Sequence, residues 1–116
     1  MLLVSPEYNN SLPGVFKNGI DWLSRPPRDS AALFANRPVA VIGASPGGFG
    51  TILAQNAWLP VLKTLGMRQW SGAKLMVSQA GKVFDPAGNL VDDAVRQQLR
   101  DFLQGFAQFV RDQKKP

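Results

Sequence analysis

Three short apolar runs along the chain have the length of β-strands. They cover residues 2–4, 38–42 and 74–78, and none of them alternates cleanly between apolar and polar residues. Continuous apolar runs are typical of strands that are covered on both faces, as in a parallel sheet between helices. The pattern therefore predicts three buried strands.

Three longer segments have the spacing of amphipathic helices. The first covers residues 13–24: Ser11 and Pro13 provide its start, and Pro26 and Pro27 stop it. The second covers residues 49–65, although Pro60 must remove one of its backbone hydrogen bonds. The third begins at an acidic pair, where negative charge suits the helix dipole, and carries one apolar stripe. The acidic pair is Asp92 and Asp93. The apolar stripe consists of Val95, Leu99, Phe102, Leu103, Phe106 and Val110.

The alternation of strand and helix predicts an α/β fold with right-handed parallel crossovers. We expect residues 1–116 to form one domain, with residues 25–36 and 81–89 as surface loops. Ligands of such sheets lie beyond the carboxyl ends of the strands. This rule indicates residues 5–13, after the first strand, and residues 43–50, after the second.

The composition excludes several kinds of chemistry. The chain has 116 residues and neither cysteine nor histidine. It therefore has no thiolate nucleophile, no histidine base and almost no means of binding a transition metal, so we expect no metal site. The net charge is +5, but the basic residues are spread along the chain. A solvated surface explains them better than a nucleic-acid interface does.

The apolar stretches are only a few residues long, too short to cross a bilayer. The first residues also lack the basic flank and the length of a signal peptide. We therefore expect a cytoplasmic protein that does not interact with membranes.

The loop after the first strand combines prolines, amides, a carboxylate and an aromatic ring. It contains Pro6, Glu7, Tyr8 and Asn9, and a rigid polar loop of this kind can present its backbone to a flat heterocycle. The alternative is an ordinary turn followed by a helix cap at Ser11. General chemistry alone favours this alternative.

A resemblance to a known protein family favours the ligand-binding interpretation of this loop over the ordinary turn. Pro6-Glu7-Tyr8-Asn9, continued by Ser11, Pro13-Gly14, Lys17-Asn18 and Ile20-Asp21-Trp22, resembles the P-E-Y-N-x-S-x-P-G-x-x-K-N-x-I-D-W signature of the NADPH-dependent FMN reductases. The resemblance implies a flavodoxin-like three-layer sandwich with a parallel sheet. It also implies that Pro6, Glu7, Tyr8 and Asn9 contact the isoalloxazine ring of FMN, mostly through backbone atoms.

The loop after the second strand is rich in glycine. Gly43-Ala44-Ser45-Pro46-Gly47-Gly48-Phe49-Gly50 matches neither the dinucleotide-binding nor the P-loop pattern. It is similar to the G-A-S-P-G-x-x-G turn of the same reductases, which implies that Ser45, Pro46 and Gly47 also lie near the flavin. No protein acid or base is expected to take part, because the cofactor performs the electron transfer.

Members of that family begin with segments that have no counterpart in this sequence. These are two strands, two helices and a G-S-x-R-x-x-S-x-N loop that binds the FMN phosphate. The resemblance therefore implies a C-terminal portion of the domain, reduced to about three strands and three helices. The strand at residues 2–4 would then be an exposed edge that pairs with something. We expect the isolated chain to self-associate or to be a fragment.

The resemblance implies a reductase that passes hydride or electrons from NADPH or NADH through FMN to a quinone, azo compound, flavin or metal oxyanion. It also implies a homodimer or homotetramer. A non-catalytic paralogue that acts as a binding or scaffold module is the main alternative. A basic nucleic-acid binder, which rests on net charge alone, is a more distant one.

Overall fold

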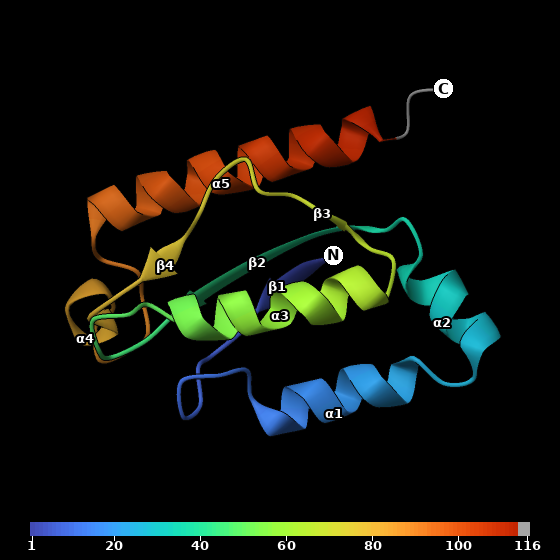
Figure 1. Ribbon diagram of the computed structural model, residues 1–116. Coiled ribbons are helices and arrows are strands. Elements are labelled where there is room, and N and C mark those ends of the chain that lie inside the picture. The colour runs from blue at the N-terminus through green and yellow to red at the C-terminus, as the bar shows by residue number, and fades with distance from the viewer. Residues whose placement is uncertain (114–116) are drawn as a thin grey trace.

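The computed structural model describes residues 1–113 as a short parallel sheet with helices on both faces (Figure 1). Its elements, in chain order, are β1 (Leu2–Val4), α1 (Gly14–Leu23), α2 (Pro27–Phe34), β2 (Pro38–Ala44), α3 (Ile52–Thr64), β3 (Arg68–Gln69), β4 (Met76–Val77), α4 (Ala80–Val83) and α5 (Asp93–Asp112). None of these helices is long and apolar enough to cross a bilayer.

Strand β2 is the centre of the sheet, and both of its sides are paired in parallel. β1 pairs with one side, in a register that places Leu3 opposite Val41. β3 and β4 share the other side, where β3 pairs near Pro38 and β4 pairs near Gly43. All three predicted strands are thus present at least in part, but the third is shortened to Met76 and Val77. β1 is an edge of this sheet, as the sequence predicted.

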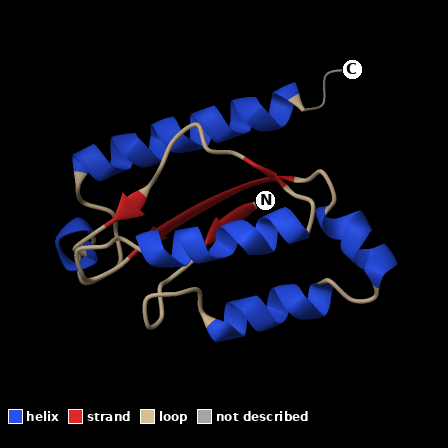
Figure 2. Cartoon of the chain, in the orientation of Figure 1, coloured by secondary structure: helices blue, strands red, loops and turns tan. Residues whose placement is uncertain are grey.

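The residues of β2 point alternately into two cores, one on each face of the sheet. Val39 and Val41 pack with α1, α2 and α3, whereas Ala40 and Ile42 pack with α4 and α5. Figure 2 shows the strands between these two layers of helices. The continuous apolar run at residues 38–42 is therefore explained by burial on both faces.

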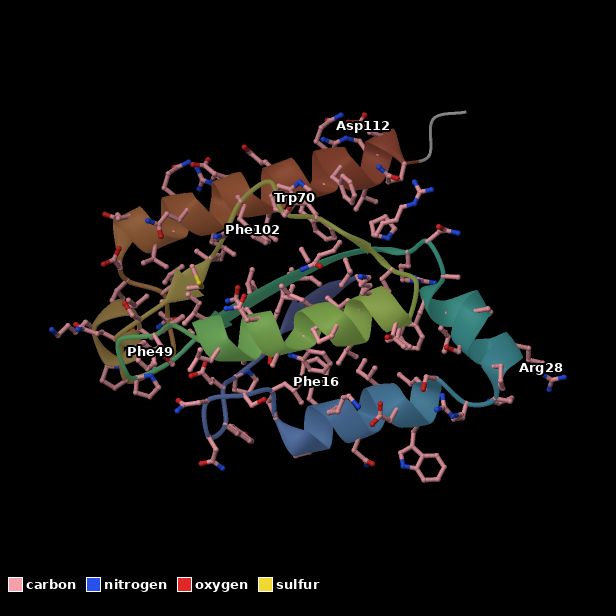
Figure 3. The ribbon with its side chains drawn as sticks, in the orientation of Figure 1. Phe16, Arg28, Phe49, Trp70, Phe102 and Asp112 are labelled. Carbon is pink, nitrogen blue, oxygen red and sulfur yellow. The ribbon has the colours of Figure 1, made fainter. Side chains whose placement is uncertain are left out.

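Aromatic residues fill both cores. Trp58 of α3 is fully buried and meets Phe16 of α1 edge to face, with ring centroids 4.8 Å apart. On the other face, Trp70 meets Phe102 of α5 at 4.9 Å (Figure 3). Trp22 is different, because 74% of its surface is exposed on α1.

The structure corrects two predicted loops. Residues 25–36 contain α2, which begins at Pro27 and buries Phe34. Proline is well suited to the first position of a helix, so Pro27 starts a helix there as well as following the end of the previous one. The segment 81–89 contributes to α4, and its remaining part turns back through a bridge between Phe84 and Leu90. The described chain therefore has five helices where three were expected.

The predicted third strand also needs correction. Only Met76 and Val77 of residues 74–78 form a strand, and β3 at Arg68 and Gln69 was missed. Two residues give too little sequence pattern to identify a strand. The predicted helices start slightly late in the structure, at Gly14, Ile52 and Asp93, and α3 continues through Pro60.

Candidate functional site

Three loops meet at the carboxyl edge of the sheet. Because β1, β2 and β4 are parallel, their C-terminal ends point the same way. Figure 1 shows the segments that follow these strands gathered at one end of the molecule, beside α4. This is the edge at which sheets of this type bind ligands. The sequence predicted two of the three loops to lie here.

The loop after β1 ends in a tight hairpin. Tyr8 and Ser11 exchange two backbone hydrogen bonds, with N···O distances of 3.0 and 3.1 Å. The two residues between them, Asn9 and Asn10, have φ values of 51° and 61°. A two-residue hairpin turn with positive φ at both positions is a type I′ turn, and asparagine is among the residues that tolerate this conformation. The turn leaves the Tyr8 side chain 54% exposed at the site.

Glu7 fastens this loop to the start of α3. One of its carboxylate oxygens accepts hydrogen bonds from the backbone N–H groups of Leu53 and Ala54, at 2.9 and 3.0 Å. These amides belong to the first turn of α3, which has no cap from the side chain of its own Thr51. Negative charge at a helix N-terminus is stabilising. The Glu7 carboxylate therefore holds this loop against a segment that is distant in the sequence.

The bases of the first two loops touch. Ser5 is buried and accepts a hydrogen bond from the Trp58 indole N–H at 2.9 Å. Beside it, a Cβ atom at Gly43 would lie 2.4 Å from the Ser5 carbonyl oxygen and 2.1 Å from the Thr51 hydroxyl oxygen. Both distances are far below van der Waals contact. Gly43 thus lets the two loops approach each other, and a larger residue would separate them.

The loop after β2 is tied to the third segment. The Ser45 N–H donates to the Val77 carbonyl, and the Ser45 carbonyl accepts from the Ala80 N–H, both at 2.9 Å. The Gly47 carbonyl accepts from the Gln79 N–H at 2.9 Å. These bonds hold the glycine-rich loop against the chain that follows β4. The backbone of Ser45 and Gly47 is therefore fixed before any ligand binds.

The candidate residues accordingly form two neighbouring groups. Pro6, Glu7, Tyr8 and Asn9 lie on the first loop, and Ser45, Pro46 and Gly47 lie on the second. The third segment, with Gln79 and Lys82, was missed. It follows a predicted strand, so the rule that placed the other two loops at this edge could have found it as well.

The exposed backbone at this edge suits a flat heterocycle with donors and acceptors on its rim. The N–H groups of Gly47 and Gly48 donate no hydrogen bond within residues 1–113. A Cβ atom at either glycine would meet nothing within 4 Å, so the space beside the loop is open. A flavin ring, which carries carbonyl and imide groups, fits such a surface. The available groups can bind and orient a ligand without acid or base catalysis.

Comparisons with known proteins identify the family. The model of the NADPH-dependent FMN reductase family matches residues 1–82. An NAD(P)H-dependent FMN reductase of Pseudomonas aeruginosa is 40% identical over 111 residues, which cover 96% of this chain and 58% of that protein. A 2-hydroxy-1,4-benzoquinone reductase of a Burkholderia species is 36% identical over 114 residues, which cover 98% of this chain and 61% of that protein. The chain spans about three fifths of the length of these relatives.

A solved structure of a flavoenzyme has the same fold as this chain. The flavoenzyme NAD(P)H:(acceptor) oxidoreductase FerB of Paracoccus denitrificans superimposes with a TM-score of 0.84 at 31% sequence identity. The superposition covers 97% of this chain and 60% of FerB. The flavodoxin-like fold expected from the sequence is thus confirmed. The family match includes both candidate loops and ends at Lys82. The chain belongs to the NADPH-dependent FMN reductase family.

Proposed function

We propose that this chain binds the ring of FMN at the carboxyl edge of its sheet and serves the reduction of a quinone-type acceptor by NAD(P)H. The observation that carries the proposal is the convergence of the Pro6–Asn9 and Ser45–Gly47 segments at one edge, with open backbone donors. When bound, FMN would supply the redox chemistry, by accepting hydride from NAD(P)H and passing electrons to the acceptor. The residues of the chain position the ring and exclude water from part of its surface.

Each loop has a distinct part in this proposal. The N–H groups of Gly47 and Gly48 donate to the rim of the ring, and Pro46 and Ser45 support them. Tyr8 and Asn9 cover the ring from the neighbouring loop, whose position Glu7 holds through its bonds to α3. The acceptor class is taken from the relatives, several of which are quinone reductases.

We propose that these residues recognise the ring of FMN and not its phosphate. Flavin titration of the chain, followed by quenching of flavin fluorescence, tests this directly. FMN and riboflavin should bind with dissociation constants within about threefold of each other, a difference of under 1 kcal/mol. Binding of neither flavin would overturn the proposal. A strong preference for FMN would overturn the assignment to the ring.

Two variants locate the flavin on the structure. Tyr8→Ala should weaken the binding of both flavins, because it removes the exposed ring at the site. Trp22→Ala removes a similarly exposed aromatic side chain from α1 and should leave flavin binding unchanged. NADPH oxidation with a quinone then separates the two functional hypotheses. A chain that neither takes up flavin nor oxidises NADPH with a quinone would support the alternative, a non-catalytic binding or scaffold module.

We also propose that the chain self-associates. Val15, Trp22 and Leu23 are 76%, 74% and 53% exposed on α1, and Val4 is 62% exposed on the edge strand β1. Exposed apolar groups and an unpaired strand edge both favour association. Light scattering after size exclusion should give a mass above 12.6 kDa. A monomer that unfolds in one cooperative step would contradict this proposal.

A further inference from the structure

A hollow lies between the glycine-rich loop and the third segment of the carboxyl edge. Its volume is about 350 Å³, and it is open to solvent. Its lining residues are Pro46, Gly47, Gly48, Gln79, Gly81 and Lys82. The volume is within the range of small-molecule sites. Because one wall is the loop proposed to face the flavin ring, a molecule in this hollow would lie beside the ring.

Backbone hydrogen bonds fix both walls of this hollow relative to each other. Gln79 donates to the Gly47 carbonyl and Ala80 donates to the Ser45 carbonyl, both at 2.9 Å. Lys82 follows on the short helix α4, where its own N–H donates to the Gln79 carbonyl at 2.9 Å. The backbone that carries Lys82 is therefore held in place beside the loop. A preorganised wall lowers the entropic cost of binding a ligand.

The charge of the hollow is positive. Lys82 is the only charged residue in its lining, and Lys82 forms no ion pair with any residue from 1 to 113. Glu7, the acid of the neighbouring loop, is bound to the amides of α3. The side-chain amide of Gln79 is the other polar group in the lining. The hollow thus combines a cation with hydrogen-bond donors and has no carboxylate of its own.

We propose that this hollow binds an acidic substituent of the electron acceptor, with Lys82 as the residue that favours anionic over neutral quinones. The inference rests on the proposed function, because it places the acceptor beside a flavin held by the glycine-rich loop. A carboxylate, a sulfonate or an ionised hydroxyl on a planar quinone has the size and charge to reach Lys82. The phosphates of NADPH and of FMN are the competing sources of negative charge.

Binding of two quinone probes to the isotope-labelled full chain, without NAD(P)H, tests the proposal. Anthraquinone-2-sulfonate carries a permanent charge, and 2-(hydroxymethyl)anthraquinone is its neutral analogue. Backbone amide signals of Gly47, Gly48, Gly81 and Lys82 should move on addition of the sulfonate. Lys82→Met should raise the Kd of the sulfonate by about twofold to fivefold, as expected for the loss of one exposed ion pair, and leave the Kd of the neutral probe unchanged. Lys82→Glu should raise it further.

Lys63→Met is the matched control, because Lys63 lies in the last turn of α3, far along the helix from the site. The inference would be overturned if both lysine variants had equal effects, or if Lys82→Met kept the preference for the sulfonate over the neutral probe. It would also be overturned if the signals that move belonged to the arginine-rich α5. So would an effect of Lys82→Met confined to NADP⁺ compared with NAD⁺, or to FMN compared with riboflavin. Flavin binding by the same samples is a separate measurement. The absence of flavin binding refutes the proposed function. Flavin binding without a Lys82-dependent preference for the sulfonate refutes only the inference that the hollow binds an acidic substituent.

Discussion

Replacement of Glu7 tests whether the loop that contains Pro6–Asn9 is held by the start of α3. In Glu7→Ala, the N–H groups of Leu53 and Ala54 lose the carboxylate oxygen to which they donate at 2.9 and 3.0 Å. In Glu7→Gln, a neutral amide oxygen of similar shape remains. The two variants therefore separate the loss of the negative charge from the loss of the acceptor.

The size of each effect follows from the location of the bonds. Charge at a helix N-terminus contributes about 0.3–1 kcal/mol, so Glu7→Gln should cost about that much. Glu7→Ala also removes the acceptor of two amides, of which that of Ala54 is partly buried. Loss of a capping side chain costs roughly 0.5–2 kcal/mol, and the alanine variant should lie near the upper end, at about 2 kcal/mol. For a domain of this size, that corresponds to a fall in Tm of roughly 8 °C.

Urea unfolding and amide hydrogen exchange measure these effects. Asp29→Asn is a suitable control, because Asp29 is also an acid in the first turn of a helix but caps no amide of α2 through its side chain. In Glu7→Ala, the amides of Leu53 and Ala54 should exchange faster, while amides in α5 should change only as much as global stability does. The variant should also bind flavin more weakly. If Glu7→Ala costs no more than Asp29→Asn, or leaves those two amides protected, the loop is not held in this way.

Three other changes should have effects of known sign. Gly43→Ala should cost about 1–3 kcal/mol in urea unfolding through overpacking against the neighbouring loop, whereas Gly48→Ala, which meets nothing within 4 Å, should be close to neutral. Asp92→Ala should destabilise α5 by about 1 kcal/mol, because the Asp92 side chain accepts from the third residue of that helix, and Asp92→Asn should recover most of the loss. Hydrogen bonds from the Asn89 side chain and backbone lower the pKa of Asp85 from 3.8, so ionised Asp85 stabilises the folded state above that pH. The difference in unfolding free energy between the wild type and Asp85→Asn should therefore shrink as the pH falls through the lowered pKa, and a difference that grows in acid would contradict this assignment.

The sequence predicted the central part of the fold because burial on two faces leaves a clear pattern. Residues 38–42 are all apolar, and in the structure residues 39–42 alternate between two cores. The apolar stripe and the acidic start of α5 were equally clear, and Asp92 does cap this helix. For α5, the hydrophobic spacing, the charge at the helix start and the packing all indicate the same helix with the same buried face.

The parts that were missed depend on contacts that no local pattern records. Strands β3 and β4 are two residues each, and their pairing with β2 is set by the chain on either side. Helix α2 was not predicted, because a proline such as Pro27 can either follow the end of one helix or begin another. Lys82 was overlooked because an isolated lysine in a polar segment is usually solvated. Its position matters only once α4 is seen beside the glycine-rich loop.

The candidate site is built mainly from backbone geometry, and this explains why a chain without histidine or cysteine can form it. Gly43 sets the distance between two loops, the Asn9-Asn10 turn closes the first loop beside an exposed Tyr8, and backbone bonds with Ser45 and Gly47 hold the third segment. Each of these acts through conformation or through main-chain hydrogen bonds. Substitutions that change the backbone should consequently harm ligand binding more than substitutions of exposed side chains do. Two exposed side chains would be exceptions. The ring of Tyr8 would cover the flavin, and the charge of Lys82 would select which acceptor binds without altering how the flavin is held.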